Sequence, residues 1–94
     1  RRSSPTFGKH VFAELDDEDH RMIYVPPGCA HGFLVLSDEA DVAYRCTDFY
    51  APEHERTLLW SDPLLEIRWP LGGPPKLSEK DARGVLLSDA ECYP

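Results

Sequence analysis

A histidine and a tyrosine on neighbouring stretches of the chain have side chains suited to proton transfer. His31 follows the turn-forming run PPGCA, and Tyr44 lies in the alternating run DVAYRCT at residues 41–47. If residue 36 pairs with residue 41 across a short turn, the two side chains share one face at about 7–8 Å. A slip of one residue would turn one of them to the other face. An imidazole and a phenol that share a face can donate and accept protons.

Short segments rich in β-forming residues would have to position these two side chains. Strands are expected at residues 10–15, 21–25, 31–36, 41–47 and 64–69, with turns rich in proline, glycine and acidic residues between them. Nine prolines and six glycines interrupt the chain too often for long helices. Ser78 and Asp81 have the spacing of a helix-capping pair. The pattern predicts an all-β fold, a sandwich or jelly-roll half, with a short C-terminal helical turn.

Length, charge and hydropathy exclude several classes of protein. At 94 residues the chain is expected to form one domain, residues 1–94. A net charge of −7 argues against nucleic-acid binding, which needs a basic surface. No apolar run reaches the length of a membrane span, so no membrane partner is expected. No charged-then-apolar leader opens the sequence, which predicts a cytoplasmic protein.

The cysteines predict neither a disulfide framework nor a zinc site. Cys29, Cys46 and Cys92 are odd in number, widely spaced and without a paired set of cysteines and histidines. Buried free thiols are the expectation for all three residues.

Several blocks of the sequence resemble one family, in order and at the family's spacing. The blocks are RRSSPTFGK at 1–9, PPGCAHGFLVLS at 26–37, YRCTDFY at 44–50, WSDP at 60–63, IRWP at 67–70 and LSEKD at 77–81. They resemble the signatures of the dTDP-4-dehydrorhamnose 3,5-epimerases over nearly the whole chain. The resemblance implies a cupin-like jelly roll that works as a homodimer, of which this chain would form the C-terminal half without the N-terminal strands.

The resemblance also implies a reaction that needs no cofactor and no metal. The family inverts carbon atoms 3 and 5 of a 4-keto-6-deoxy sugar carried on dTDP, a step of dTDP-rhamnose biosynthesis. The keto group acidifies the hydrogens on both neighbouring carbons. A base can therefore remove each proton, and an acid can return it on the opposite face of the sugar.

For the catalytic groups, the resemblance places the proton-donating tyrosine on Tyr44 and the aspartate that orients the base on Asp81. The family's base is a histidine in an RGLHYQ block, and the sequence has no such block. The remaining histidines, His10, His20 and His54, are expected at the surface. Catalysis is therefore expected to be impaired in this chain by itself.

For the ligand, the resemblance implies that His31 contacts the sugar and that Phe49 or Tyr50 stacks on the thymine ring. Lys80 is the candidate cation for the pyrophosphate. The run that ends at His31 also resembles one metal-binding block of other cupins. The block that would supply two more histidines and a glutamate is missing, and one histidine cannot hold a metal ion.

Two functional hypotheses follow from these observations. The chain is an epimerase, whose activity depends on further residues, or it is a non-catalytic cupin-like module that binds a sugar nucleotide or a protein partner. A natural truncated homologue, a gene fragment and an expressed piece of a longer protein are all open as its origin. A half barrel exposes sheet edges and an apolar face, so self-association is expected in each case.

Overall fold

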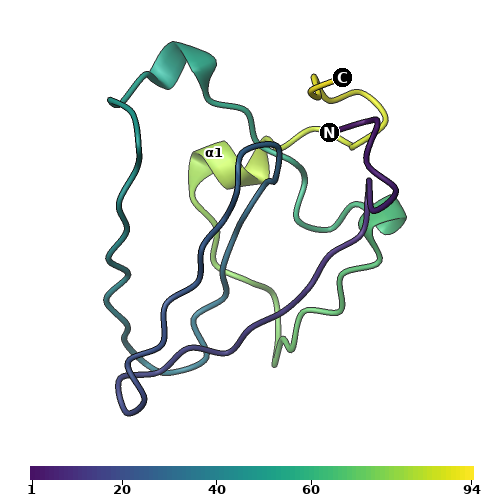
Figure 1. Ribbon diagram of the computed structural model, residues 1–94. Coiled ribbons are helices and arrows are strands. Elements are labelled where there is room, and N and C mark those ends of the chain that lie inside the picture. The colour runs from purple at the N-terminus through teal and green to yellow at the C-terminus, as the bar shows by residue number, and fades with distance from the viewer.

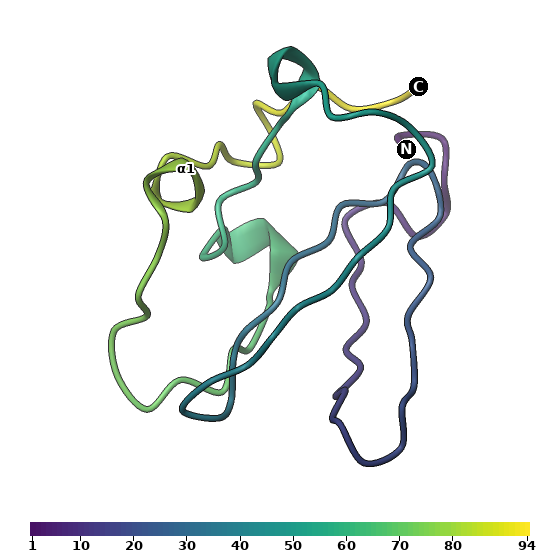
Figure 2. The same cartoon turned by 90° about the vertical axis from the view of Figure 1, so that its left-hand side faces the viewer.

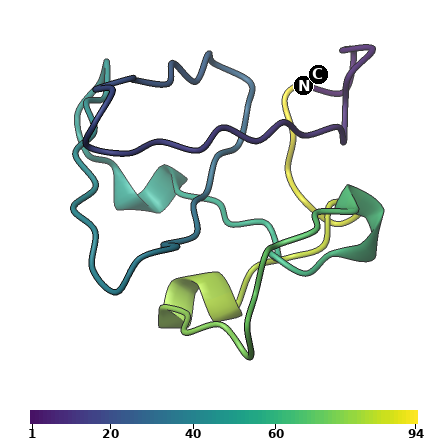
Figure 3. The same ribbon diagram turned by 90° about the horizontal axis from the view of Figure 1, so that it is seen from below.

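The structure is a computed structural model that describes residues 1–94, and most of its backbone is irregular. It contains one α-helix, α1 (Glu79–Ala82), and two 3-10 turns, η1 (Pro52–His54) and η2 (Pro63–Leu65). Two long hairpin-shaped excursions, one purple to dark blue and one blue to teal, extend from the part that carries the helical turns (Figure 2). The two chain ends lie side by side (Figure 3), where the Arg2 amide donates to the Tyr93 carbonyl at 2.8 Å.

The expectation of an all-β jelly roll is wrong for this structure, because the chain forms no strand. The only β pairing is an isolated parallel bridge between Leu58 and Val85. None of the 19 backbone hydrogen bonds joins two of the five segments that were expected to be strands. The first four of these segments are extended in Figure 1 and belong to no sheet, whereas the fifth, residues 64–69, begins inside η2.

The sheet is missing because nothing in the structure buries its expected apolar face. Phe33 and Tyr44, which would lie opposite each other if residue 36 paired with residue 41, are 63% and 77% exposed. No apolar side chain of the chain is buried. A hairpin becomes stable only when a third strand or a helix covers one of its faces, since that burial offsets the entropy lost on ordering the backbone. The alternation of apolar and polar residues therefore gives extended segments here, but these segments do not pair as strands.

The segment expected as the last strand, residues 64–69, is interrupted for a local reason. Pro63 is a favourable first residue of a helical turn, and the Asp62 carboxylate caps that turn. Glu66, with φ at 52°, then takes the left-handed conformation that ends η2. A run that begins with a capped turn and a left-handed residue cannot continue as a straight strand.

The helical turn near the C-terminus confirms the capping prediction. The Ser78 hydroxyl accepts a hydrogen bond from the Asp81 amide at 3.1 Å, so Ser78 is the N-cap of α1. Arg83 ends the helix and pairs with Glu79 at 3.0 Å on its exposed side.

The acidic run at residues 16–19 forms an exposed turn, as expected for a solvated loop. The Asp16 carboxylate accepts from the amides of Glu18 and Asp19 at 3.0 and 3.2 Å. These backbone donors, Asp19 first and then Glu18, hold the pKa of Asp16 below its usual value of 3.8.

The cysteines are free thiols, but the prediction that they are buried is wrong. Cys29 and Cys46 are exposed, and Cys92 is half-buried. Since no packed apolar layer forms, the structure offers no interior in which these thiols could lie. None of the helices has the length and apolar composition that a membrane crossing requires.

The best-connected part of the molecule joins residues 57–65 to residues 84–87, and we call these two segments the clasp. The Leu59 amide donates to the Val85 carbonyl at 2.8 Å, and the Val85 amide donates to the Thr57 carbonyl at 2.9 Å. Gly84 permits this approach, because a Cβ at that position would lie 2.6 Å from the Leu58 carbonyl atoms. The close backbone contact therefore excludes any side chain at residue 84.

Asp62 is the one buried residue of the chain, at 3% exposure, and it fastens the clasp. One carboxylate oxygen accepts from the Leu64 amide at 3.0 Å and caps η2. The other accepts from the Leu87 amide at 2.6 Å, across the clasp. Hydrogen bonds from amides to an ionised acceptor are among the stronger ones in proteins. Asp62 thus links the turn that follows Trp60 to the segment that follows α1.

Replacing Asp62 with alanine is expected to open the clasp. The substitution leaves two amides without their acceptor, at a cost of about 1 kcal/mol or more, since both hydrogen bonds are part-buried. Hydrogen exchange of the Leu64 and Leu87 amides should therefore accelerate by at least about fivefold.

Asp16→Ala is the matched control, because Asp16 also accepts from two amides but lies in an exposed turn. It should leave the exchange of Leu64 and Leu87 unchanged. Equal exchange rates in Asp62→Ala and the unaltered chain would contradict the role assigned to Asp62.

Candidate functional site

An open groove of about 610 Å³ lies between the end of η1 and α1. Its lining is almost entirely polar and charged, and Val85 is its one hydrophobic residue. The groove exists because the clasp holds residues 55–57 beside residues 78–85 (Figure 1). It therefore depends on contacts between segments that are about 25 residues apart in the sequence, such as that of Lys80 with Glu55.

Lys80 is the residue of this groove to which the sequence assigns a ligand role. Its ammonium donates to the Glu55 carboxylate at 3.2 Å, and the ammonium has no other hydrogen-bond partner. The hydrogen bond to Glu55, followed by the charge of Glu55, raises the pKa of Lys80 above its usual 10.5. The pair contributes stability below about pH 10.5, and this contribution is lost as the pH rises through the raised pKa. Lys80 is therefore fully charged at neutral pH.

The other cations of the groove are also held by carboxylates. Arg56 pairs with Glu91 at 2.6 Å and donates to the backbone carbonyls of Glu53 and Glu55. Arg83 pairs with Glu79 at 3.0 Å. Each of the three cations that line the groove is therefore paired with one carboxylate, so the groove has little net charge.

Asp81 and Tyr50 lie close enough to Lys80 to act on it electrostatically. Both contribute to the raised pKa of Lys80, after the larger contributions of Glu55. Asp81 is at the third position of α1, where its amide donates to the N-cap Ser78, and its carboxylate makes no hydrogen bond. Of the six residues singled out from the sequence, only Lys80 lines the groove, and Asp81 is its neighbour in α1.

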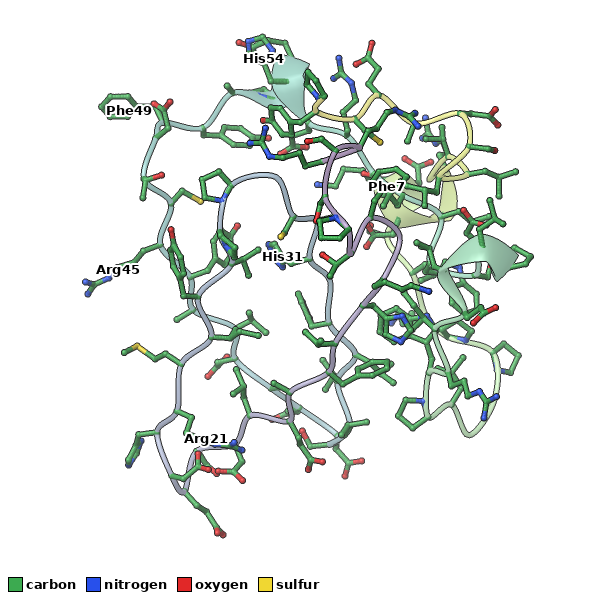
Figure 4. The ribbon with its side chains drawn as sticks, turned by 45° about the vertical axis from the view of Figure 1, so that its right-hand side comes forward. Phe7, Arg21, His31, Arg45, Phe49 and His54 are labelled. Carbon is green, nitrogen blue, oxygen red and sulfur yellow. The ribbon has the colours of Figure 1, made fainter.

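His31 and Tyr44 lie outside this groove. Both side chains are exposed, and neither makes a hydrogen bond. Figure 4 shows His31 toward the middle of the view, whereas Arg45, the neighbour of Tyr44, points outward at one edge. The expected roles of His31 and Tyr44 stay predictions, because this arrangement encloses neither of them in a cavity.

Phe49 also lies apart from the groove around Lys80. It is 96% exposed and projects from the edge of the molecule (Figure 4). A smaller hollow of about 280 Å³ beside it is lined by residues 46–49. Of the two aromatic residues considered for the thymine ring, only Tyr50 contributes to the raised pKa of Lys80, and neither lines the groove.

Sequence reasoning missed two residues on which this region depends, Glu55 and Asp62. Glu55 stands in the charged run EHER, which has the pattern of a solvated loop. Asp62 stands directly before Pro63, and an acidic residue before proline is a known signal for the start of a helical turn. The role of Asp62 could therefore have been predicted from the sequence. The contact of Glu55 with Lys80 could not, because it joins residues 25 positions apart. No three residues among histidine, cysteine, aspartate and glutamate gather as a set of metal ligands.

Comparison with known proteins identifies relatives of the chain along its whole length. The sequence model of the dTDP-4-dehydrorhamnose 3,5-epimerase family matches residues 1–89. A relative of that name from Pseudomonas aeruginosa is 53% identical over 94 residues, which are 100% of this chain and 52% of the relative. Relatives from Shigella flexneri and Methanothermobacter thermautotrophicus are 47% and 46% identical, over 99% of this chain and 51% of each relative.

The chain therefore spans about half the length of these relatives. The match is much longer than half of the chain itself, and it confirms the family predicted from the sequence motifs. The chain belongs to the dTDP-4-dehydrorhamnose 3,5-epimerase family.

Proposed function

We propose that this chain supplies the substrate-binding and proton-donating part of a dTDP-4-dehydrorhamnose 3,5-epimerase. The observation that supports the proposal is the family match over residues 1–89, within which the motifs occur in the family's order. The substrate would be a dTDP-4-keto-6-deoxy sugar, and the product its epimer at carbon atoms 3 and 5.

Tyr44 is the proposed proton donor. A phenol with a pKa near 10 keeps its proton at neutral pH and can deliver it to the carbon of an enolate. The high exposure of Tyr44 leaves its hydroxyl accessible to a ligand. His31 is the proposed contact to the sugar, from the neighbouring segment.

The nucleotide is the proposed ligand of the groove. Lys80 would contact the pyrophosphate, because its ammonium is charged and open to solvent on one side. Tyr50 would stack on the thymine ring, since it lies within electrostatic reach of Lys80, and Phe49 is the alternative. Asp81 would orient the base that removes the proton. The histidine of the RGLHYQ block has no counterpart in the sequence, so the proposal gives this chain no base of its own.

Self-association is also part of the proposal. Large apolar side chains such as Val11, Met22 and Tyr24 are 78–93% exposed, which is unfavourable in water. We expect light scattering at micromolar concentration to report a dimer or a larger species. A single sharp monomer peak would contradict this expectation.

Deuterium exchange tests the proposed activity directly. The chain is incubated in D₂O with a dTDP-4-keto-6-deoxy sugar, alone and with a polypeptide that contains the remaining half of the Pseudomonas aeruginosa relative. We expect deuterium at carbon atoms 3 and 5 in the mixture, above the uncatalysed rate. Tyr44→Phe should lower this incorporation by about 10²–10⁴-fold, the usual worth of a general acid.

Tyr24→Phe is the matched control, because Tyr24 is equally exposed and has no proposed role. It should leave the incorporation unchanged. If dTDP binds but no deuterium enters in either mixture, the chain is a non-catalytic module that binds a sugar nucleotide.

A further inference from the structure

The ammonium of Lys80 is already occupied within the chain. Its one hydrogen-bond partner is the Glu55 carboxylate, at 3.2 Å, and the side chain of Lys80 is 60% exposed. An anion that enters the groove can therefore reach Lys80 from solvent. The Glu55 carboxylate repels this anion and competes with it for the Lys80 ammonium.

The remaining cations of the groove offer an anion no easier contact. The guanidinium of Arg56 is held by Glu91 and by two backbone carbonyls. Arg83 is held by Glu79. With three cations and two carboxylates along its lining, the groove attracts anions only weakly, and the state of Lys80 decides how well one is held.

We infer that Glu55 is an internal competitor that controls access of phosphate groups to Lys80. An anion must displace the carboxylate of Glu55, or share Lys80 with it, before it can bind. This inference rests on the proposed function, in which Lys80 contacts a pyrophosphate. It adds that Glu55, which is not among the expected ligand contacts, sets the affinity of the groove for phosphate groups.

The expected size of the effect follows from the weakness of exposed ion pairs. A chain whose Lys80 is partly occupied binds an anion with an affinity reduced by the fraction of free Lys80. For a solvent-exposed pair this factor is about two- to fivefold. Glu55→Gln keeps an oxygen that can accept from Lys80 but removes the competing charge, so it should tighten anion binding by this factor.

Glu53→Gln is the matched control, because Glu53 lies in the same charged run but contacts His54 at 3.9 Å instead of Lys80. Lys80→Met removes the site itself. The two substitutions separate a general change in surface charge from the specific competition at Lys80.

The test is a titration of the full 94-residue chain with inorganic pyrophosphate at low salt, followed by NMR or calorimetry. Glu55→Gln should bind pyrophosphate about two- to fivefold more tightly than the unaltered chain, and the gain should shrink in high salt. Glu53→Gln should bind like the unaltered chain. In the Lys80→Met background, Glu55→Gln should bring no gain.

An unchanged or weaker affinity of Glu55→Gln overturns the inference, as does an equal gain without Lys80 or no binding by Glu55→Gln at all. The pair itself is checked independently, because Glu55→Gln should lower the pKa of Lys80 toward 10.5. A failure of the proposed function is distinct from these results, since it would appear as absent deuterium exchange while the competition at Lys80 persists.

Discussion

The structure depends on the carboxylate of Asp62. Its two oxygens accept from the Leu64 and Leu87 amides, which belong to segments on opposite sides of the clasp. A buried carboxylate without such donors would be strongly unfavourable, so burial and hydrogen bonding at this residue require each other. Since the rest of the chain has no packed apolar interior, this polar contact and the adjacent backbone bridge take the place of a core.

The groove around Lys80 is a consequence of that contact. The segment fastened by Asp62 continues from α1, which carries Lys80 and Asp81, and the opposite segment continues from the run that carries Glu55. The expected functional residues are thereby divided into two groups. Lys80 lines the groove and Asp81 follows it in α1, whereas the proposed proton donor Tyr44 is 77% exposed and lies outside the groove. The cation proposed for the pyrophosphate therefore lies in the groove, and the residue proposed to donate the proton does not.

Local signals were read correctly from the sequence, and signals that depend on distant packing were not. The Ser78 cap needs only residues within one helical turn, so its prediction was confirmed. The alternation at residues 41–47 gave an extended segment, but pairing requires a neighbour that buries one face, and none does so here. The partnership of Glu55 and Lys80 joins residues that no short-range pattern relates. The family was predictable because its motifs are runs of adjacent residues.

Residue-resolved hydrogen exchange of the unaltered chain tests this account most directly, because it measures where backbone order resides. We expect slow exchange at the amides of Leu59, Leu64, Val85 and Leu87, which all donate hydrogen bonds in the clasp. Amides at residues 31–36 and 41–47 should exchange at the rate of an open chain. Strong protection across those two segments, with rapid exchange at the clasp, would contradict the account.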